Sequence, residues 1–144
     1  MKVLRWFLGG LAFGVISQIV GGIIYGGIFS RWYEASQEFF RPMNHPGFTV
    51  GLPVMNLVQG LLIGLVYAVL YKGIPTKSSV SKGTIFGLLL WIAGPLPGML
   101  IQFCISTMRF PLPCLINSLV VTVVGCLVIA AIWGKSLEPV KKEE

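Results

Sequence analysis

The sequence contains no aspartate, and its five glutamates all lie in residues 34–38 and 138–144. The long apolar segments therefore hold no carboxylate for a set of nucleophile, base and orienting acid, and we predict no catalytic residues and no enzymatic activity. Ionisable side chains within a membrane are also the usual sign of a pump or a proton-coupled transporter. Their absence here argues against both functions.

Cysteine is scarce as well. The three cysteines are Cys104, Cys114 and Cys126. No Cys-x-x-Cys pair occurs, which argues against a thioredoxin-like redox centre. Cys104 and Cys114 fall on either side of a short external loop, where they form either a structural disulfide or two buried thiols. Cys126 is interpreted as a small packing residue.

His45 is the only histidine, so a haem with two histidine ligands cannot be held by this chain alone. Glu34 and Glu38 are the nearest carboxylates that might join it at a metal. Metal sites normally need three or four converging ligands. We interpret the glutamates as solvated partners of nearby arginines, and predict no metal and no cofactor.

Charged residues make up only 11% of the 144 residues, and the mean hydropathy is +0.83. Uncharged runs cover residues 6–30, 42–71, 83–108 and 110–134. Each exceeds the roughly 20 residues that a helix needs to cross a bilayer. We predict an all-α, integral membrane bundle of four transmembrane helices in one domain. The helices are placed at 6–29, 52–71, 83–104 and 113–134.

The first apolar run is longer than the 7–15 residues of a signal peptide core, and no Ala-x-Ala-like cleavage site follows it. We therefore expect it to remain as the first helix. The connections are a loop at 30–47, a loop at 72–82 and a tail at 135–144.

Eight of the eleven lysines and arginines lie at the N-terminus, in the loop 72–82 and in the tail. The other face holds only Arg31, Arg41 and Arg109. By the positive-inside rule, both termini, the loop 72–82 and the tail are predicted to be cytoplasmic, and the loop 30–47 external. The net charge of +6 is thus a topology signal, and no basic run is long enough to predict nucleic-acid binding. The predicted partner is the lipid bilayer.

The external loop predicts a short amphipathic helix in the membrane interface. Trp32, Ala35, Ser36, Phe39 and Met43 recur at helical spacing, and Pro42 ends the helix.

Small residues recur at four-residue spacing in every predicted helix, which allows two helix backbones to approach closely. We interpret these faces as packing within the bundle, and the alternative is association with other membrane subunits or with a second copy. The residues are Gly10, Gly14, Gly22 and Gly26; Gly60, Gly64 and Ala68; Gly83 and Gly87; and Ser118, Thr122 and Cys126.

The third apolar run contains Gly-Pro-Leu-Pro-Gly at residues 94–98. Pro95 and Pro97 each remove a backbone donor, which predicts a kink or a local opening in the membrane. The sequence leaves two interpretations open: a packing kink, or a ligand site or pore lined by these prolines and the amides. The amides are Asn56, Gln102 and Asn117.

An internal repeat is a further hypothesis. Leu-Pro-Val-Met-Asn at 52–56 resembles Leu-Pro-Cys-Leu-Ile-Asn at 112–117, and the same alignment pairs Gly64 with Gly125. Aligning Arg5 with Lys82 also pairs Gly10 with Gly87. The pattern indicates either a parallel duplication of a helical hairpin or chance identities in a low-diversity sequence.

The run LPVMNLVQGLLIGLVYAVLY, the turn KGIPTKSSVSKG and the run TIFGLLLWIAGPLPG together resemble a loose class of small, uncharacterised bacterial four-helix membrane proteins. The resemblance covers about residues 50–100. It implies a multi-pass protein of the bacterial inner membrane and carries no catalytic residue.

Two functions from different classes fit these patterns. The first is an accessory, assembly or stabilising subunit of a larger membrane complex, acting through helix packing. The alternative is a small channel or carrier for a neutral or lipidic molecule, using the broken third helix.

Overall fold

A computed structural model describes residues 2–36, 44–76, 78–105 and 112–134 of the chain. These residues contain helices and turns and no strand. Four helical segments are long and apolar enough to cross a membrane: residues 3–28, 49–73, 79–101 and 112–134. The predicted all-α bundle of four such helices is confirmed, and each predicted span lies within a few residues of the observed one.

The first span consists of α1 (Lys2–Ile23) and a π-helical turn, η1 (Ile24–Ile28). The second consists of a π-helical turn, η3 (Gly47–Gly51), then α3 (Leu52–Leu70) and the short 3₁₀ helix η4 (Tyr71–Gly73). Proline fits the start of α3 because the first helical turn has no intrahelical partner for its N–H groups.

The third span is divided into α4 (Ser79–Ala93) and α5 (Pro95–Ile105). The fourth is the unbroken α6 (Leu112–Gly134). A short helix, α2 (Ser30–Ala35), is present at the start of the predicted external loop, and its Tyr33 is buried. The remainder of its predicted length, residues 37–43, lies outside the described residues, as does the tail 135–144.

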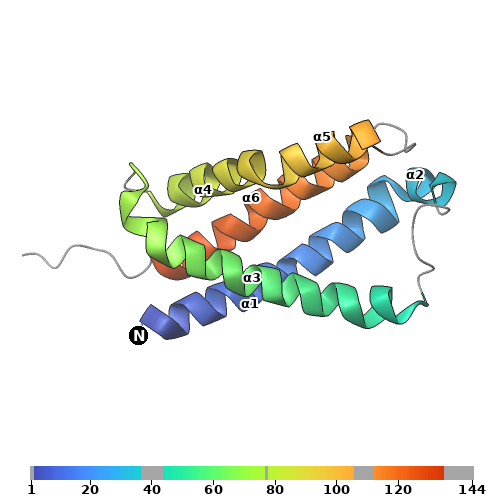
Figure 1. Cartoon of the computed structure of the whole chain (residues 1–144). Coiled ribbons are helices and arrows are strands. Elements are labelled where there is room, and N and C mark those ends of the chain that lie inside the picture. The colour runs from blue at the N-terminus through green and yellow to red at the C-terminus, as the bar shows by residue number, and fades with distance from the viewer. Residues whose placement is uncertain (1, 37–43, 77, 106–111, 135–144) are drawn as a thin grey trace, which may run out of the picture.

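The helices form two closely packed pairs, α1 with α3 and α4 with α6 (Figure 1). The pairs meet along α1 and α6, so these two helices occupy the middle of the bundle. α1 and α3 cross and then separate toward the end that carries α2 (Figure 1). Both pairs are antiparallel hairpins, as the repeat hypothesis expects, but the close contact of α1 with α6 has no equivalent between α4 and α3.

The core is aromatic and lies toward the end where α3 finishes and α4 begins. The Tyr67 side chain is fully buried, and its ring centroid lies 5.1 Å from that of Phe86 and 6.2 Å from that of Trp133. Tyr71 packs against Trp133 at 5.5 Å. Side chains from α3, α4 and α6 therefore meet here, although the backbones of α3 and α4 do not pack closely.

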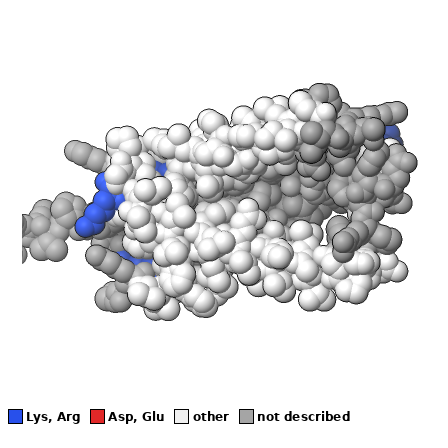
Figure 2. Space-filling view, viewed as in Figure 1, with Lys and Arg blue, Asp and Glu red and all other residues white. Residues whose placement is uncertain are grey.

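The charges separate the two ends of the bundle. Arg5, Lys72 and Lys82 lie where α1 begins, α3 ends and α4 begins, which we call the basic end. Lys82 caps this end: its Nζ atom lies 4.2 Å from the centroid of the Tyr71 ring and donates to the Tyr71 carbonyl. Figure 2 shows blue side chains gathered at this end and a long uncharged surface beyond it.

Candidate functional site

Four glycines create the contact between α1 and α3. A methyl group added at Gly10 would lie 2.8 Å from the Leu61 Cα atom, and one at Gly14 would lie 2.8 Å from the Asn56 carbonyl oxygen. Methyl groups at Gly60 and Gly64 would meet the α1 backbone in the same way. The structure thus brings these four predicted residues together at an interface where there is no room for a side chain larger than the hydrogen of glycine.

Two side-chain hydrogen bonds cross the same interface. Asn56 Nδ2 donates to Gln18 Oε1 at 2.6 Å, and the Trp6 indole N–H donates to the Leu61 carbonyl oxygen at 3.0 Å. Ala68, the last small residue predicted on α3, packs partly buried against the aromatic core. Asn56 therefore serves to join two helices in this structure.

Gly22 and Gly26 pack against no other helix in the described part of the chain. Both are exposed, and a methyl group at either would meet no other atom within 4 Å. The reason is the crossing of the helices: α1 and α3 separate toward the end that carries α2, so the glycine face continues along the first span after its neighbour has left it (Figure 1).

The pair α4 and α6 is built by the same means. A methyl group at Gly83 would lie 2.9 Å from the Cys126 carbonyl oxygen, and one at Gly87 would lie 3.0 Å from the Val123 Cα atom. Thr122 and Cys126 are buried on the facing side of α6. Beyond them, Ser118 Oγ accepts a hydrogen bond from the Trp91 indole N–H at 2.9 Å and donates to the Leu115 carbonyl. These small residues therefore pack against a neighbouring helix.

Two further glycines of α6, Gly125 and Gly134, also make close contacts. The Phe13 ring lies directly against Gly125, and Ser79 lies against Gly134 and donates its hydroxyl to the Ala130 carbonyl. Gly125 belongs to a second face of α6, which packs on α1. The alignment of Gly64 with Gly125 in the repeat was the sequence signal that marked this residue.

Asn117 points toward α1. Its Oδ1 atom is buried without a hydrogen-bond partner, close to Gly21, and its side chain also approaches the hydroxyl of Tyr25. Asn117 and Asn56 thus both face the central helix α1, at separate places. The side chain of Gln102 lies outside the described residues.

The break in the third span is a single residue. Gly94 has φ −121° and ψ −83°, which ends α4, and α5 starts at Pro95. Two backbone bonds meet at Gly94: its N–H donates to the Leu90 carbonyl at 3.0 Å, and its carbonyl accepts from the Gly98 N–H at 3.3 Å. The predicted interruption of the helix is thus present.

Proline leaves two carbonyl groups without their usual donors. Because Pro95 and Pro97 have no N–H, the carbonyls of Trp91 and Ala93 cannot receive the helical bond from four residues later. Gly94 lies seven residues before the end of the span at Ile101, about 10 Å along the helix and thus inside a hydrocarbon layer of roughly 30 Å. The weakened backbone therefore falls at the depth where water is absent.

The break is also exposed. Ala93, Gly94, Pro97 and Gly98 are all classed as exposed, and a methyl group at Gly98 would meet no atom within 4 Å. Only 11% of the apolar stretch of this span is buried, against 28% to 33% in the other three. Asn56 bonds to Gln18 and Asn117 lies beside Gly21, so both of these amides face α1.

Other candidate chemistry is limited. The three cysteines are free thiols, with Cys104 exposed and Cys126 buried. No cluster of three metal-ligating side chains occurs within the described ranges. His45 accepts a hydrogen bond from the Gly47 N–H at 3.0 Å, which fixes the turn before α3.

No protein family, curated protein or solved structure matches this chain.

Proposed function

We propose that this protein is an accessory or stabilising subunit of a larger membrane complex, and that another membrane-spanning helix docks on the face formed by α4 and α5. The observation that carries the proposal is the exposed break at Gly94. Interrupted backbone at membrane depth is tolerated where protein or a water-filled cavity covers it, and not where it faces lipid. The described residues of the bundle leave the break uncovered, so a partner helix supplies the missing contact.

The surface around the break fits such a partner. Gly94 and Gly98 are four residues apart and present no side chain, so a second backbone can approach the helix there. Leu89 in α4 and Ile101 in α5 precede and follow the glycines in the sequence and are 59% and 61% exposed. A small or hydroxyl-bearing residue on the partner would reach the carbonyls of Trp91 and Ala93.

The channel or carrier hypothesis has less support from the geometry. It requires the prolines and the amides to line one path, whereas Asn56 bonds to Gln18 and Asn117 faces Gly21. The subunit proposal requires only the outer face of α4 and α5.

We also propose that the basic end faces the cytoplasm of a bacterial cell, which places both termini inside. Support comes from the grouping of Arg5, Lys72 and Lys82 at one end and from the positive-inside rule. A fluorescent protein fused after residue 144 should fluoresce, and alkaline phosphatase fused there should be inactive. An active phosphatase fusion would contradict this orientation and place the basic end outside the cytoplasm.

Photo-crosslinking in native membranes tests the docking face. A photoreactive phenylalanine analogue at Leu89 or Ile101 should yield an adduct with one other membrane polypeptide. The controls are Val54 and Val69 on α3, which are 50% and 73% exposed to the surroundings. Adducts of equal yield at all four positions, or adducts with lipid alone at Leu89 and Ile101, would refute the proposal.

A further inference from the structure

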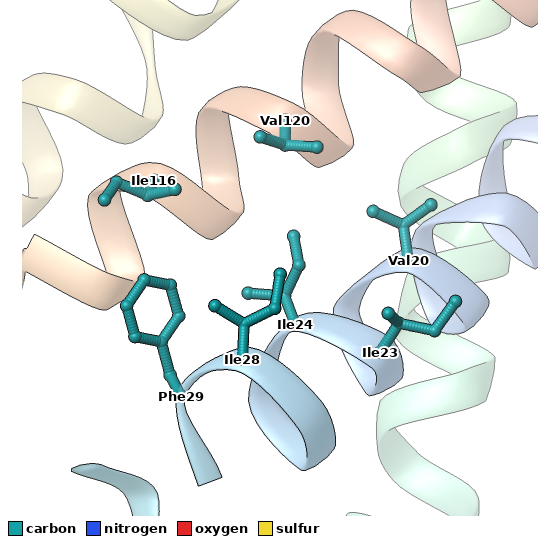
Figure 3. Close-up of a pocket in the computed structure, with 7 residues that line it drawn as sticks. All are labelled: Val20, Ile23, Ile24, Ile28, Phe29, Ile116 and Val120. Atoms are coloured by element: carbon teal, nitrogen blue, oxygen red, sulfur yellow. The ribbon is translucent and has the colours of Figure 1, made fainter. Parts of the chain in front are cut away.

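An apolar groove lies between the outer part of α1 and α6, away from α4 and α5. Its volume is about 240 Å³. Figure 3 shows side chains from both helices directed into it, and all of them are aliphatic or aromatic. They are Val20, Ile23, Ile24, Ile28, Phe29, Ile116 and Val120.

The shape of α1 explains why the groove exists. The π-helical turn Ile24–Ile28 is wider than an α-helix, and the Phe29 N–H bonds to the Ile24 carbonyl at 2.8 Å. Gly22, Gly26 and Gly27 present no side chain to any neighbour within 4 Å. The wall of the groove on this side is therefore formed by the isoleucines of the turn and not by its glycines.

The position of the groove along the first span indicates which kind of molecule occupies it. The first span ends at Ile28, so the groove runs from the membrane boundary at Ile28 to Val20, about 12 Å inward. A wholly apolar cavity does not hold water, because water needs two to four polar partners. At roughly 30 Å³ for a water-sized group, the volume has room for about eight methylene groups.

One positive charge lies close to the groove in the sequence. Phe29 lines the groove, and Arg31, which is exposed on α2, follows two residues later beyond the end of the span. Glu34 lies further along α2. A chain lying in the groove therefore brings its phosphate to the level of Arg31, where a guanidinium forms paired hydrogen bonds with phosphate oxygens.

The geometry points to a phospholipid site, in which one acyl chain fills the groove between α1 and α6 and the phosphate lies beside Arg31. The acyl chain is held by van der Waals contact and not by the exclusion of water, because lipid tails are as apolar as the helices. A chain that fills the void supplies dispersion partners that its lining otherwise lacks. This inference concerns a different face from the docking surface and does not depend on the subunit proposal.

The test is native mass spectrometry of the full-length protein, stripped of lipid in detergent and titrated with palmitoyl-oleoyl phosphatidylglycerol. The wild-type protein should retain one lipid. Val120→Phe places a ring in the groove and should lower the one-lipid fraction at least fivefold. Val54→Phe is the matched control, because it makes the same change at an exposed position on α3, and should retain the lipid.

A second variant tests the headgroup. Arg31→Gln should lower retention of phosphatidylglycerol about tenfold and leave the acyl contact intact, so the groove should still protect one chain against exchange with detergent. Equal retention by Val120→Phe and the wild-type protein would overturn the site. A protein dimer that Val120→Phe abolishes would overturn it too, because the occupant would then be a second copy.

Discussion

Replacing single glycines by alanine tests how α1 and α3 are held together. The structure offers a matched set: Gly10 and Gly14 face the backbone of α3, whereas Gly22 and Gly26 face open space on the same helix. All four substitutions add one methyl group to an apolar helix. Any difference between the two pairs therefore reports the interface and not the intrinsic preference for helix.

The expected magnitude follows from what the added methyl group meets. At Gly10 the nearest atoms are the Leu61 Cα at 2.8 Å and the Gly60 carbonyl oxygen at 2.9 Å, both in the backbone, so no side-chain rotation relieves the contact. Overpacking of this kind costs about 1–3 kcal/mol. Alanine regains up to about 1 kcal/mol of helix propensity. Gly10→Ala should thus lower the free energy of unfolding by about 1–2 kcal/mol.

Gly14→Ala should show a similar loss, and it should also separate Asn56 from Gln18. Gly22→Ala and Gly26→Ala should leave the free energy of unfolding unchanged or raise it by up to about 1 kcal/mol. The assay is reversible unfolding in mixed micelles, followed by circular dichroism and tryptophan fluorescence. Equal stability of Gly10→Ala and Gly22→Ala would refute the close contact of α1 with α3.

Three further predictions concern polar groups within the bundle. In a double-mutant cycle, Gln18→Leu and Asn56→Leu should show a coupling free energy of about 0.5–1.5 kcal/mol, and a value of zero would contradict the 2.6 Å hydrogen bond. Tyr67→Phe should keep or raise stability by up to about 1 kcal/mol, since the Tyr67 hydroxyl is buried without a hydrogen-bond partner; a clear loss in the same unfolding assay would show that this hydroxyl has one. The double change Pro95→Ala and Pro97→Ala restores two backbone donors, so it should raise the free energy of unfolding of the isolated bundle by about 1–3 kcal/mol. It should also reduce crosslinking at Leu89, and unchanged crosslinking would show that partner binding does not depend on the break.

Charge placement made the number of spans predictable. Because each crossing must be almost free of charge, the uncharged runs located all four helices to within a few residues. The proline pair located the break for an equally local reason, since a missing N–H acts on the residue four places earlier. Both features depend on residues near in sequence and need no knowledge of the neighbouring helices.

Which faces meet was only partly predictable. Four-residue spacing marked Gly10 and Gly14, but the same spacing continues to Gly22 and Gly26, where α3 has already separated. The crossing angle of two helices sets the length of their contact, and the residue pattern of one helix does not determine that angle. α6 was harder still, because it packs on both α4 and α1: Ser118 lies on one face and Asn117 on the other.

The proposal that another subunit covers the break is tested most directly by native mass spectrometry of the complex extracted from its own membranes in mild detergent. The wild-type protein should travel with another membrane polypeptide in a fixed ratio. Gly98→Leu should abolish that complex while Gly26→Leu preserves it, because both glycines are exposed but only Gly98 adjoins the break. A wild-type protein found only alone or with copies of itself, or a complex that survives Gly98→Leu, would contradict the account.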